Sequence, residues 1–346
     1  MRNSACLLCD TVQLTPGEEL LVLNSAAEPF VALAAQRSGT GTITLAEDNV
    51  ATMRELMSKG LPILRQRAFH EYILRAPAST MDVAVMNLIY QPSKVWLMHG
   101  LQVALYALRE GGKLYVVGAK DRGILSMAKR MQDYFGNVET VAISKGHRVL
   151  CSVKAVETAS EIRKQASQED ALRVFADSQL DEGTRLLLET MEVRVTDEAL
   201  DIGCGAGFIG LHIARQASQG QVTMVDASLA AVAVAQHAIE QSGLINVRVL
   251  ASDGAQAVLA QRFDLVATNP PFHQGGLQTT AIAERFIREA AQVLRANGRF
   301  YLVANRFLKY EPTLWACFKQ VEEVGGNTRY KVLRSLFPVE EMEEPC

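Results

Sequence analysis

The chain has 346 residues, of which 49% are hydrophobic and 21% charged, and its formal net charge is −3. This composition is typical of a globular protein with room for two domains, and the small net charge argues against a strongly electrostatic nucleic-acid binder. No apolar run reaches the roughly 18 residues that a membrane-spanning helix needs, so we expect a cytoplasmic monomer with no membrane partner.

A C-x-x-C pair, Cys6 and Cys9, is the first recognisable pattern along the chain. A structural zinc site takes four ligands, and no second pair or cluster of cysteine and histidine follows to complete one, so we expect no metal. The spread of the other cysteines fits a reducing compartment better than a disulfide framework. They are Cys151, Cys204, Cys317 and Cys346.

Positive charge is concentrated in the first half of the chain. Residues 1–155 contain 17 lysines and arginines against 13 acidic residues, whereas residues 156–346 contain 18 against 25. A polyanion would therefore be bound mainly by the first half, through contacts to phosphate groups. The RNA-binding candidates are Arg65, Arg67, Lys129 and Arg130, although a solvated surface explains any single one of them equally well.

A polar stretch separates the two halves. Residues 156–170, VETASEIRKQASQED, contain few apolar side chains, and we interpret 156–172 as a linker that is helical in part. The expected domains are therefore residues 1–155 and residues 173–346.

The second half alternates short apolar runs with helical stretches, which is typical of a parallel sheet with crossover helices. The stretch EALDIGCGAGFIG predicts a strand ending at Ile202, a glycine loop, and a helix from about Phe208. Three glycines in the loop, Gly203, Gly205 and Gly207, permit a tight turn and let a ligand approach the backbone. Dinucleotide-binding folds use similar loops, so the glycines alone do not identify the ligand.

Two acidic residues follow at the ends of the next two predicted strands. Asp226 is placed to accept hydrogen bonds from both ribose hydroxyls of a nucleoside, and Asp253 to bind an adenine amino group, with Gly254 beside it. Each alone could be a helix cap. Together with the loop, they predict a site for S-adenosylmethionine. Its expected lining is Asp201, Gly203, Cys204, Gly205, Gly207, Asp226, Ala227, Asp253, Gly254 and Asn269.

A fourth predicted strand, Asp264 to Thr268, ends at the sequence Asn269-Pro270-Pro271-Phe272. Open α/β sheets bind ligands at this edge. The Asn269 side chain and the Pro270 carbonyl are two acceptors for the two donors of an exocyclic amine, and Phe272 can stack on the ring that carries it. These four residues are the catalytic candidates. We expect His273 and Asn305 to approach the substrate, although a structural amide explains Asn305 equally well.

These motifs resemble the class I methyltransferases, and more narrowly the bacterial ribosomal RNA guanine-N2 methyltransferases. The resemblance covers the second half, in DIGCGAGFIG, NPPFHQG and GRFYLVANRFLKYEPTL. The family's lead-in to the glycine loop is matched by Phe175, Asp181, Gly183 and Thr184, a segment that the resemblance places over the cofactor. It implies a substrate in ribosomal RNA or a ribosomal subunit, most simply the small one.

The first half repeats the second with altered chemistry. At a shift of 179 residues, LLVLN lies on ALDIG and Glu47 on Asp226, and at a shift of 182 Asn87 meets Asn269. We therefore expect two tandem Rossmann-like methyltransferase domains from a duplication. Asn24 and Glu28 replace loop glycines, so the first copy is expected to be degenerate and to serve RNA positioning or folding support.

The predicted activity is methylation of guanine N2 in 16S ribosomal RNA. Alternatives are the same reaction on 23S ribosomal RNA, or methylation of adenine N6 or a protein glutamine, since N-P-P-[FY] serves these amines too. A non-enzymatic RNA-binding assembly factor would be favoured by broken motifs in the second half, and these motifs are intact.

Overall fold

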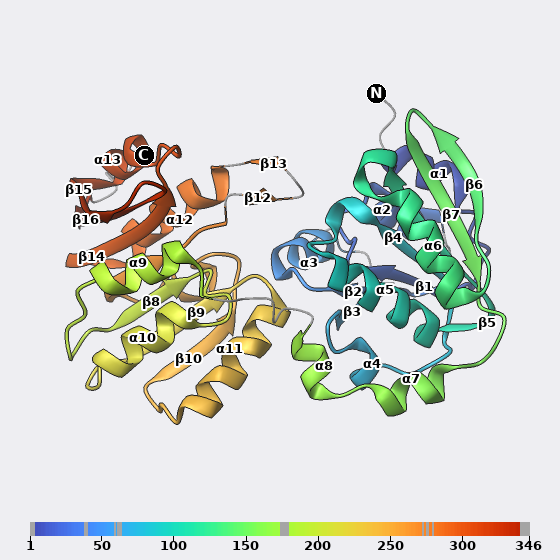
Figure 1. Cartoon of the computed structure of the whole chain (residues 1–346), viewed down its shortest axis with the longest axis horizontal. Coiled ribbons are helices and arrows are strands. Elements are labelled where there is room, and N and C mark those ends of the chain that lie inside the picture. The colour runs from blue at the N-terminus through green and yellow to red at the C-terminus, as the bar shows by residue number, and fades with distance from the viewer. Residues whose placement is uncertain are drawn as a thin grey trace. The chain divides into compact units, whose positions relative to one another are not determined.

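The computed structural model describes residues 4–37, 41–58, 60, 64–173, 180–271, 273–274, 277–278 and 280–339. The chain divides into two compact units, residues 1–174 and residues 175–346 (Figure 1). Within the described ranges, no helix is long and apolar enough to cross a membrane.

The first unit contains a sheet with the strand order β3-β2-β1-β4-β5-β7-β6, in which β1 to β5 are parallel and β6 and β7 form an antiparallel edge. Its strands are β1 (Leu20–Leu23), β2 (Ile43–Glu47), β3 (Leu64–Ala68), β4 (Met81–Asn87), β5 (Leu108–Ala119), β6 (Glu139–Ser144) and β7 (His147–Val153). Its helices are α1 (Ser4–Thr11), α2 (Pro29–Arg37), α3 (Val50–Met57), α4 (Tyr72–Arg75), η1 (Leu88–Tyr90), α5 (Lys94–Ala107), η2 (Lys120–Arg122), α6 (Ile124–Phe135), α7 (Ala159–Gln165) and α8 (Gln168–Arg173).

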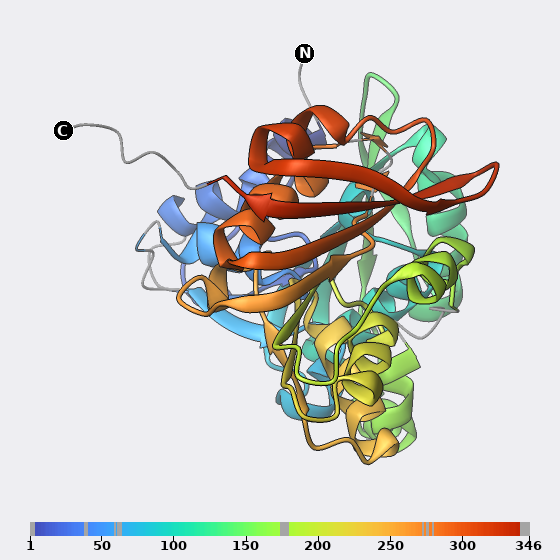
Figure 2. The same cartoon turned by 90° about the vertical axis from the view of Figure 1, so that its left-hand side faces the viewer.

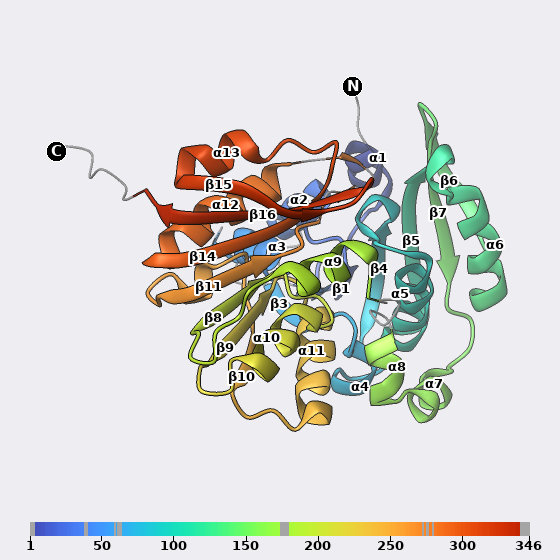
Figure 3. The same ribbon diagram turned by 60° about the vertical axis from the view of Figure 1, so that its left-hand side comes forward.

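The second unit has an equivalent sheet with the order β10-β9-β8-β11-β14-β16-β15 (Figure 3). Its strands are β8 (Ala199–Ile202), β9 (Val222–Asp226), β10 (Val247–Ala251), β11 (Phe263–Thr268), β14 (Leu294–Asn305), β15 (Phe318–Gly326) and β16 (Tyr330–Pro338), besides a small pair, β12 (His273–Gln274) and β13 (Leu277–Gln278). Its helices are α9 (Glu182–Thr190), α10 (Phe208–Gln216), α11 (Leu229–Ser242), η3 (Gln256–Val258), α12 (Ala281–Val293) and α13 (Glu311–Cys317). Figure 2 shows β15 and β16 as the long red hairpin at the sheet's edge.

The predicted duplication is confirmed by the two sheets, which share one strand order. β1 and β2 begin 179 residues before β8 and β9, and β5 begins 186 residues before β14, with twelve residues in each. The copies also share an ion pair between the fourth and fifth strands, Arg109–Asp82 at 2.6 Å and Arg295–Asp264 at 2.5 Å. Equivalent strands and equivalent bonds at constant offsets indicate one fold used twice.

The central strands of the second sheet are buried on both faces. Leu200 and Ile202 of β8 belong to an apolar cluster with α12 and α13, whereas Ala199 belongs to a second cluster with α9, α10 and α11. Successive side chains of a strand point to opposite faces, so this alternation means that helices cover both sides. The carboxyl ends of the parallel strands are therefore the part of the sheet where polar groups reach a ligand.

The segment that we expect to be a linker contains α7 and α8. Arg163 of α7 donates to the Ile73 carbonyl and, at 3.1 Å, to the Tyr106 hydroxyl. Both acceptors lie in the first unit, so α7 packs as part of it. The assignment of residues 156–172 as a linker stays a prediction.

Candidate functional site

The predicted site residues of the second half lie where its parallel strands end. The strand preceding the glycine loop ends at Ile202, and α10 begins at Phe208, as the sequence predicts. β9 ends at Asp226 and β11 at Thr268, one residue before Asn269. Since β8, β9 and β11 are parallel neighbours, these positions share one edge of the sheet.

The glycine loop has the left-handed backbone that glycine favours. Gly203, Gly205 and Gly207 have φ of 73°, 54° and 84°. A Cβ at Gly205 would project into open space, with no atom within 4 Å. Any side chain there would occupy the space in which a ligand approaches the backbone.

Two carboxylates lie behind this loop. Asp226 Oδ2 accepts from the Gly205 amide at 2.9 Å and Oδ1 from the Ser228 amide at 2.8 Å, and burial raises the pKa of this carboxyl. A carboxylate accepts about four hydrogen bonds, so Asp226 retains capacity for ribose hydroxyls. Asp201 is fully buried; its Oδ2 accepts from the Gly210 amide, while Oδ1 has no partner among the described residues. An unpaired buried acceptor beside an open glycine loop fits a cationic ligand group.

Asp253 and Gly254 follow β10, as expected. Asp253 Oδ1 accepts from Arg285 of α12 at 2.5 Å, and Arg285 also approaches Glu289. The ion pair fixes the Asp253 carboxylate at the edge of the sheet. Its predicted contact with adenine stays a prediction.

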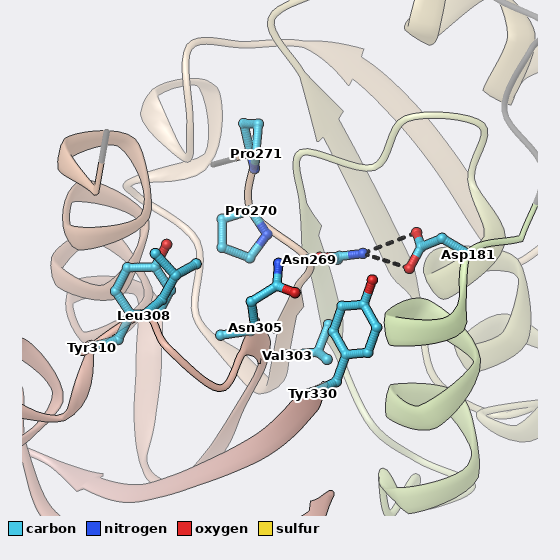
Figure 4. A pocket seen from close by; sticks show the side chains of 10 residues that line it. Asp181, Asn269, Pro270, Pro271, Val303, Asn305, Leu308, Tyr310 and Tyr330 are labelled. Carbon is cyan, nitrogen blue, oxygen red and sulfur yellow. Dashed lines mark hydrogen bonds between the residues drawn. The ribbon is translucent and has the colours of Figure 1, made fainter. Parts of the chain in front are cut away.

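Asn269 lies at the mouth of a cavity of about 410 Å³, a volume within the usual range of small-molecule sites. Its amide nitrogen donates to Thr184 Oγ1 at 2.8 Å and to Asp181 Oδ2 at 3.2 Å (Figure 4). The amide carbonyl is therefore the polar end that remains for a substrate. The lining is Asp181, Asn269, Pro270, Pro271, Val303, Ala304, Asn305, Leu308, Tyr310 and Tyr330.

The predicted substrate contacts fare differently. Asn305 ends β14 and lines the cavity beside Pro270 (Figure 4). Phe272 lies outside the described residues, as does the side chain of His273, whose backbone forms β12. The cavity thus brings together Asn269, Pro270, Pro271 and Asn305.

Sequence reasoning missed two cavity tyrosines. Tyr330 begins β16 and pairs with Asn305 in the antiparallel register, and Arg329 lies over its ring at 5.4 Å. Tyr310 is 1% exposed, and its hydroxyl has no hydrogen-bond partner in the described structure. The only sequence signal for Tyr330 is its place at the start of the last strand.

The equivalent region of the first unit is filled by its own side chains. Glu28, at the position of Gly207, is 2% exposed and accepts from Asn87 Nδ2 at 2.6 Å. Asn87, the counterpart of Asn269, is also 2% exposed. Glu47 accepts from the Ala26 amide at 2.9 Å, as Asp226 does from Gly205. The framework is kept, but the space for a ligand is occupied.

The four basic candidates do not form one patch. Arg65 and Arg67 are exposed on β3, an edge strand, whereas Lys129 and Arg130 lie on α6, which packs on β5 and β7. Four strand spacings of about 4.8 Å separate β3 from β5, so the two pairs are roughly 20 Å apart.

Comparison with known proteins adds a family to this geometry. The family described as "Methyltransferase small domain" matches residues 169–334. A "Ribosomal RNA small subunit methyltransferase C" from Shewanella loihica is 33% identical over 73% of this chain and 77% of its own. The protein of that name from Pseudomonas entomophila is 33% identical over 75% and 81%. The solved T. thermophilus 16S rRNA N2 G1207 methyltransferase, in complex with AdoMet and guanosine, has a TM-score of 0.81 and 28% identity, covering 96% of this chain and 91% of that one.

Proposed function

The chain belongs to the family of ribosomal RNA small subunit methyltransferases C, and we propose that it transfers a methyl group from S-adenosylmethionine to the N2 amine of a guanine in 16S ribosomal RNA. The observation that carries the proposal is the position of Asn269, whose amide lies at a base-sized cavity and at the same sheet edge as the glycine loop and Asp226.

The cofactor is held by groups at the ends of β8, β9 and β10. Asp226 accepts the ribose hydroxyls, Asp253 faces the adenine, and Asp201 with the loop around Gly205 takes the methionine part. S-adenosylmethionine supplies an electrophilic methyl group on a sulfonium sulfur.

The chain's own residues act on the amine. A guanine N2 lone pair is delocalised into the ring, so the nitrogen is a weak nucleophile. The Asn269 side-chain oxygen and the Pro270 carbonyl accept its two N–H groups, which orients the nitrogen, favours its pyramidal form and stabilises its growing positive charge. The proton passes to solvent once nitrogen is positively charged, so no strong base is required.

The first unit is proposed to position RNA without binding cofactor. Its counterpart pocket contains Glu28 and Asn87, and its exposed arginines Arg65 and Arg67 are suited to phosphate contacts. All residues assigned to cofactor and amine lie in the second unit of one chain, which supports a monomeric enzyme acting in the cytoplasm, where its RNA substrate would be.

Nucleoside analysis tests this proposal. The full-length protein is incubated with labelled S-adenosylmethionine and either naked 16S ribosomal RNA or small subunits, and the digest is examined by mass spectrometry. We expect N2-methylguanosine. Asn269→Ala should lower turnover by roughly 10² or more with cofactor affinity unchanged. Label in 23S ribosomal RNA, in N6-methyladenosine or in protein would reject the assignment.

A further inference from the structure

The first turn of α9 contacts the amide of Asn269. Asp181 is the N-cap of this helix, and its Oδ1 accepts from the Thr184 backbone amide at 2.8 Å. The Thr184 side chain donates to Asp181 Oδ2, also at 2.8 Å. Asn269 Nδ2 then donates to Thr184 Oγ1 at 2.8 Å and to Asp181 Oδ2 at 3.2 Å. These bonds form a network that runs from Asn269 to a carboxylate.

The direction of this network fixes the orientation of the amide. The Thr184 hydroxyl has one proton, which it donates to Asp181, so towards Asn269 its oxygen can only accept. Asp181 as a carboxylate likewise only accepts. The NH2 group of Asn269 must therefore face α9, because turning the amide over would place its oxygen against two acceptors.

We propose that Asp181 and Thr184 are positioning residues that hold the Asn269 carbonyl toward the target amine. The inference rests on the proposed function and assigns the role of the lead-in segment. A preoriented acceptor need not reorganise as charge develops on nitrogen. Donation toward a carboxylate also polarises the amide and makes its oxygen a stronger acceptor. Both effects act in the transition state, so they change turnover more than binding.

The neighbouring residues hold this turn in place. A Cβ at Gly183 would lie 3.0 Å from the ring of Tyr330, so a residue without a side chain lets the tyrosine pack on the helix start. Glu182 accepts from Asn327 at 3.0 Å and from Arg329 at 2.7 Å. The loop between β15 and β16 therefore fixes the turn from the side opposite to β11.

Helix capping alone does not explain the contacts of Thr184. A cap requires the Asp181 carboxylate and the Thr184 backbone amide, whereas the Thr184 hydroxyl adds nothing to it. Thr184 is 6% exposed, so Thr184→Val keeps the shape and the cap but removes the acceptor for Asn269. Thr184→Ser keeps the hydroxyl.

The experiment measures turnover, Michaelis constant for RNA, cofactor affinity and melting temperature in the full-length protein. We expect Thr184→Val to lower turnover about tenfold with cofactor affinity unchanged, and Thr184→Ser to restore most of it. Thr190→Val is the matched control, because Thr190, at the other end of α9, donates only to its own helix, to the Leu186 carbonyl at 2.7 Å. Its turnover should equal that of the wild type.

A double-mutant cycle separates positioning from general damage. In an Asn269→Ala background, Thr184→Val should have no further effect on turnover, because both act through one amide. If Thr184→Val does not fold, Asp181→Asn serves instead, since asparagine still caps the helix while the charge is lost. Wild-type turnover in a folded Thr184→Val, or an undiminished effect without Asn269, would overturn the inference. An inactive wild type would instead reject the proposed function.

Discussion

At the scale of single residues, Asp201 has the most constrained carboxyl of the second unit. Burial and the nearby Asp226 raise its pKa from 3.8 to about 7, although the Gly210 amide donates to it. Between about pH 4 and pH 7 the unfolded chain has released this proton while the folded chain retains it. Stability contributed by this group is therefore present below pH 4 and is lost as the pH rises to 7.

Asp201→Asn should remove this part of the pH dependence. Asparagine keeps the oxygen that accepts from Gly210 but does not titrate. Urea unfolding between pH 4.5 and 7 should show the wild type losing stability relative to the variant by up to about 1.4 kcal/mol per pH unit. Contributions of all other groups cancel in the difference. Parallel curves for the two proteins would mean that Asp201 is ionised throughout.

Tyr310 provides a second test at this scale. Its buried hydroxyl has no partner in the described structure, so Tyr310→Phe should leave the free energy of unfolding unchanged or raise it by about 1 kcal/mol. If the hydroxyl binds the substrate, the Michaelis constant for RNA should rise about 3- to 10-fold. Tyr301→Phe is the control: that hydroxyl accepts from the Glu192 amide, so its loss should lower stability and leave the Michaelis constant alone. An unchanged Michaelis constant in Tyr310→Phe would exclude the contact.

The residues that sequence alone could place are those that end a strand. Asp226 and Asn269 follow apolar runs, and parallel neighbours end at one edge, so their proximity is predictable. The contact of Thr184 with Asn269 joins residues 85 positions apart, and depends on where α9 packs. Tyr330 reaches the cavity through the register of β14 with β16, which no local pattern sets.

At the scale of elements, β3 is the clearest candidate for an RNA contact. It is an edge strand whose middle three residues are exposed, and Arg65 and Arg67 point to the same face because they are two residues apart. Its counterpart β10 has a single exposed arginine, Arg248, which is hydrogen bonded to Gln261 and Thr223. The arginine pair is thus particular to the first unit.

Charge reversal on β3 tests this role. Arg65→Glu with Arg67→Glu should raise the Michaelis constant for RNA and flatten its salt dependence by about one unit of slope for each phosphate group that the protein no longer neutralises. The control reverses Arg215 and Arg262, which lie at the opposite edge of the second sheet from the site and change net charge equally. Equal effects of the two double variants would show a general charge effect instead of a specific interaction with RNA.

Elements were predictable where one copy could be compared with the other. β1 and β2 are short and carry no motif of their own, yet their offset from β8 and β9 identifies them. The pieces between units were harder, since α7 and α8 lie in a polar stretch where periodicity is weak. The packing of Arg163 against Ile73 and Tyr106, a tertiary contact, decides where α7 belongs.

At the scale of the whole molecule, the two copies keep one framework and differ in their free space. The bond from Ala26 to Glu47 reproduces the bond from Gly205 to Asp226, at 2.9 Å in both. Gln91 adds donors to the Leu23, Asn24 and Asn87 carbonyls of the first copy. A ligand there would have to displace buried groups that already satisfy one another, whereas in the second copy Gly205 faces open space.

The full-length chain should therefore bind one S-adenosylmethionine. Isothermal titration of the wild type should give a stoichiometry of one, and Asp226→Ala should weaken binding at least tenfold, about 1.4 kcal/mol, with no second site left behind. Glu47→Ala is the matched variant of the other copy. It removes the acceptor for Ala26 and should lower the melting temperature without changing cofactor affinity or stoichiometry. Two cofactors per chain, or residual binding in Asp226→Ala that Glu47→Ala abolishes, would mean that the first copy retains a working pocket despite Glu28.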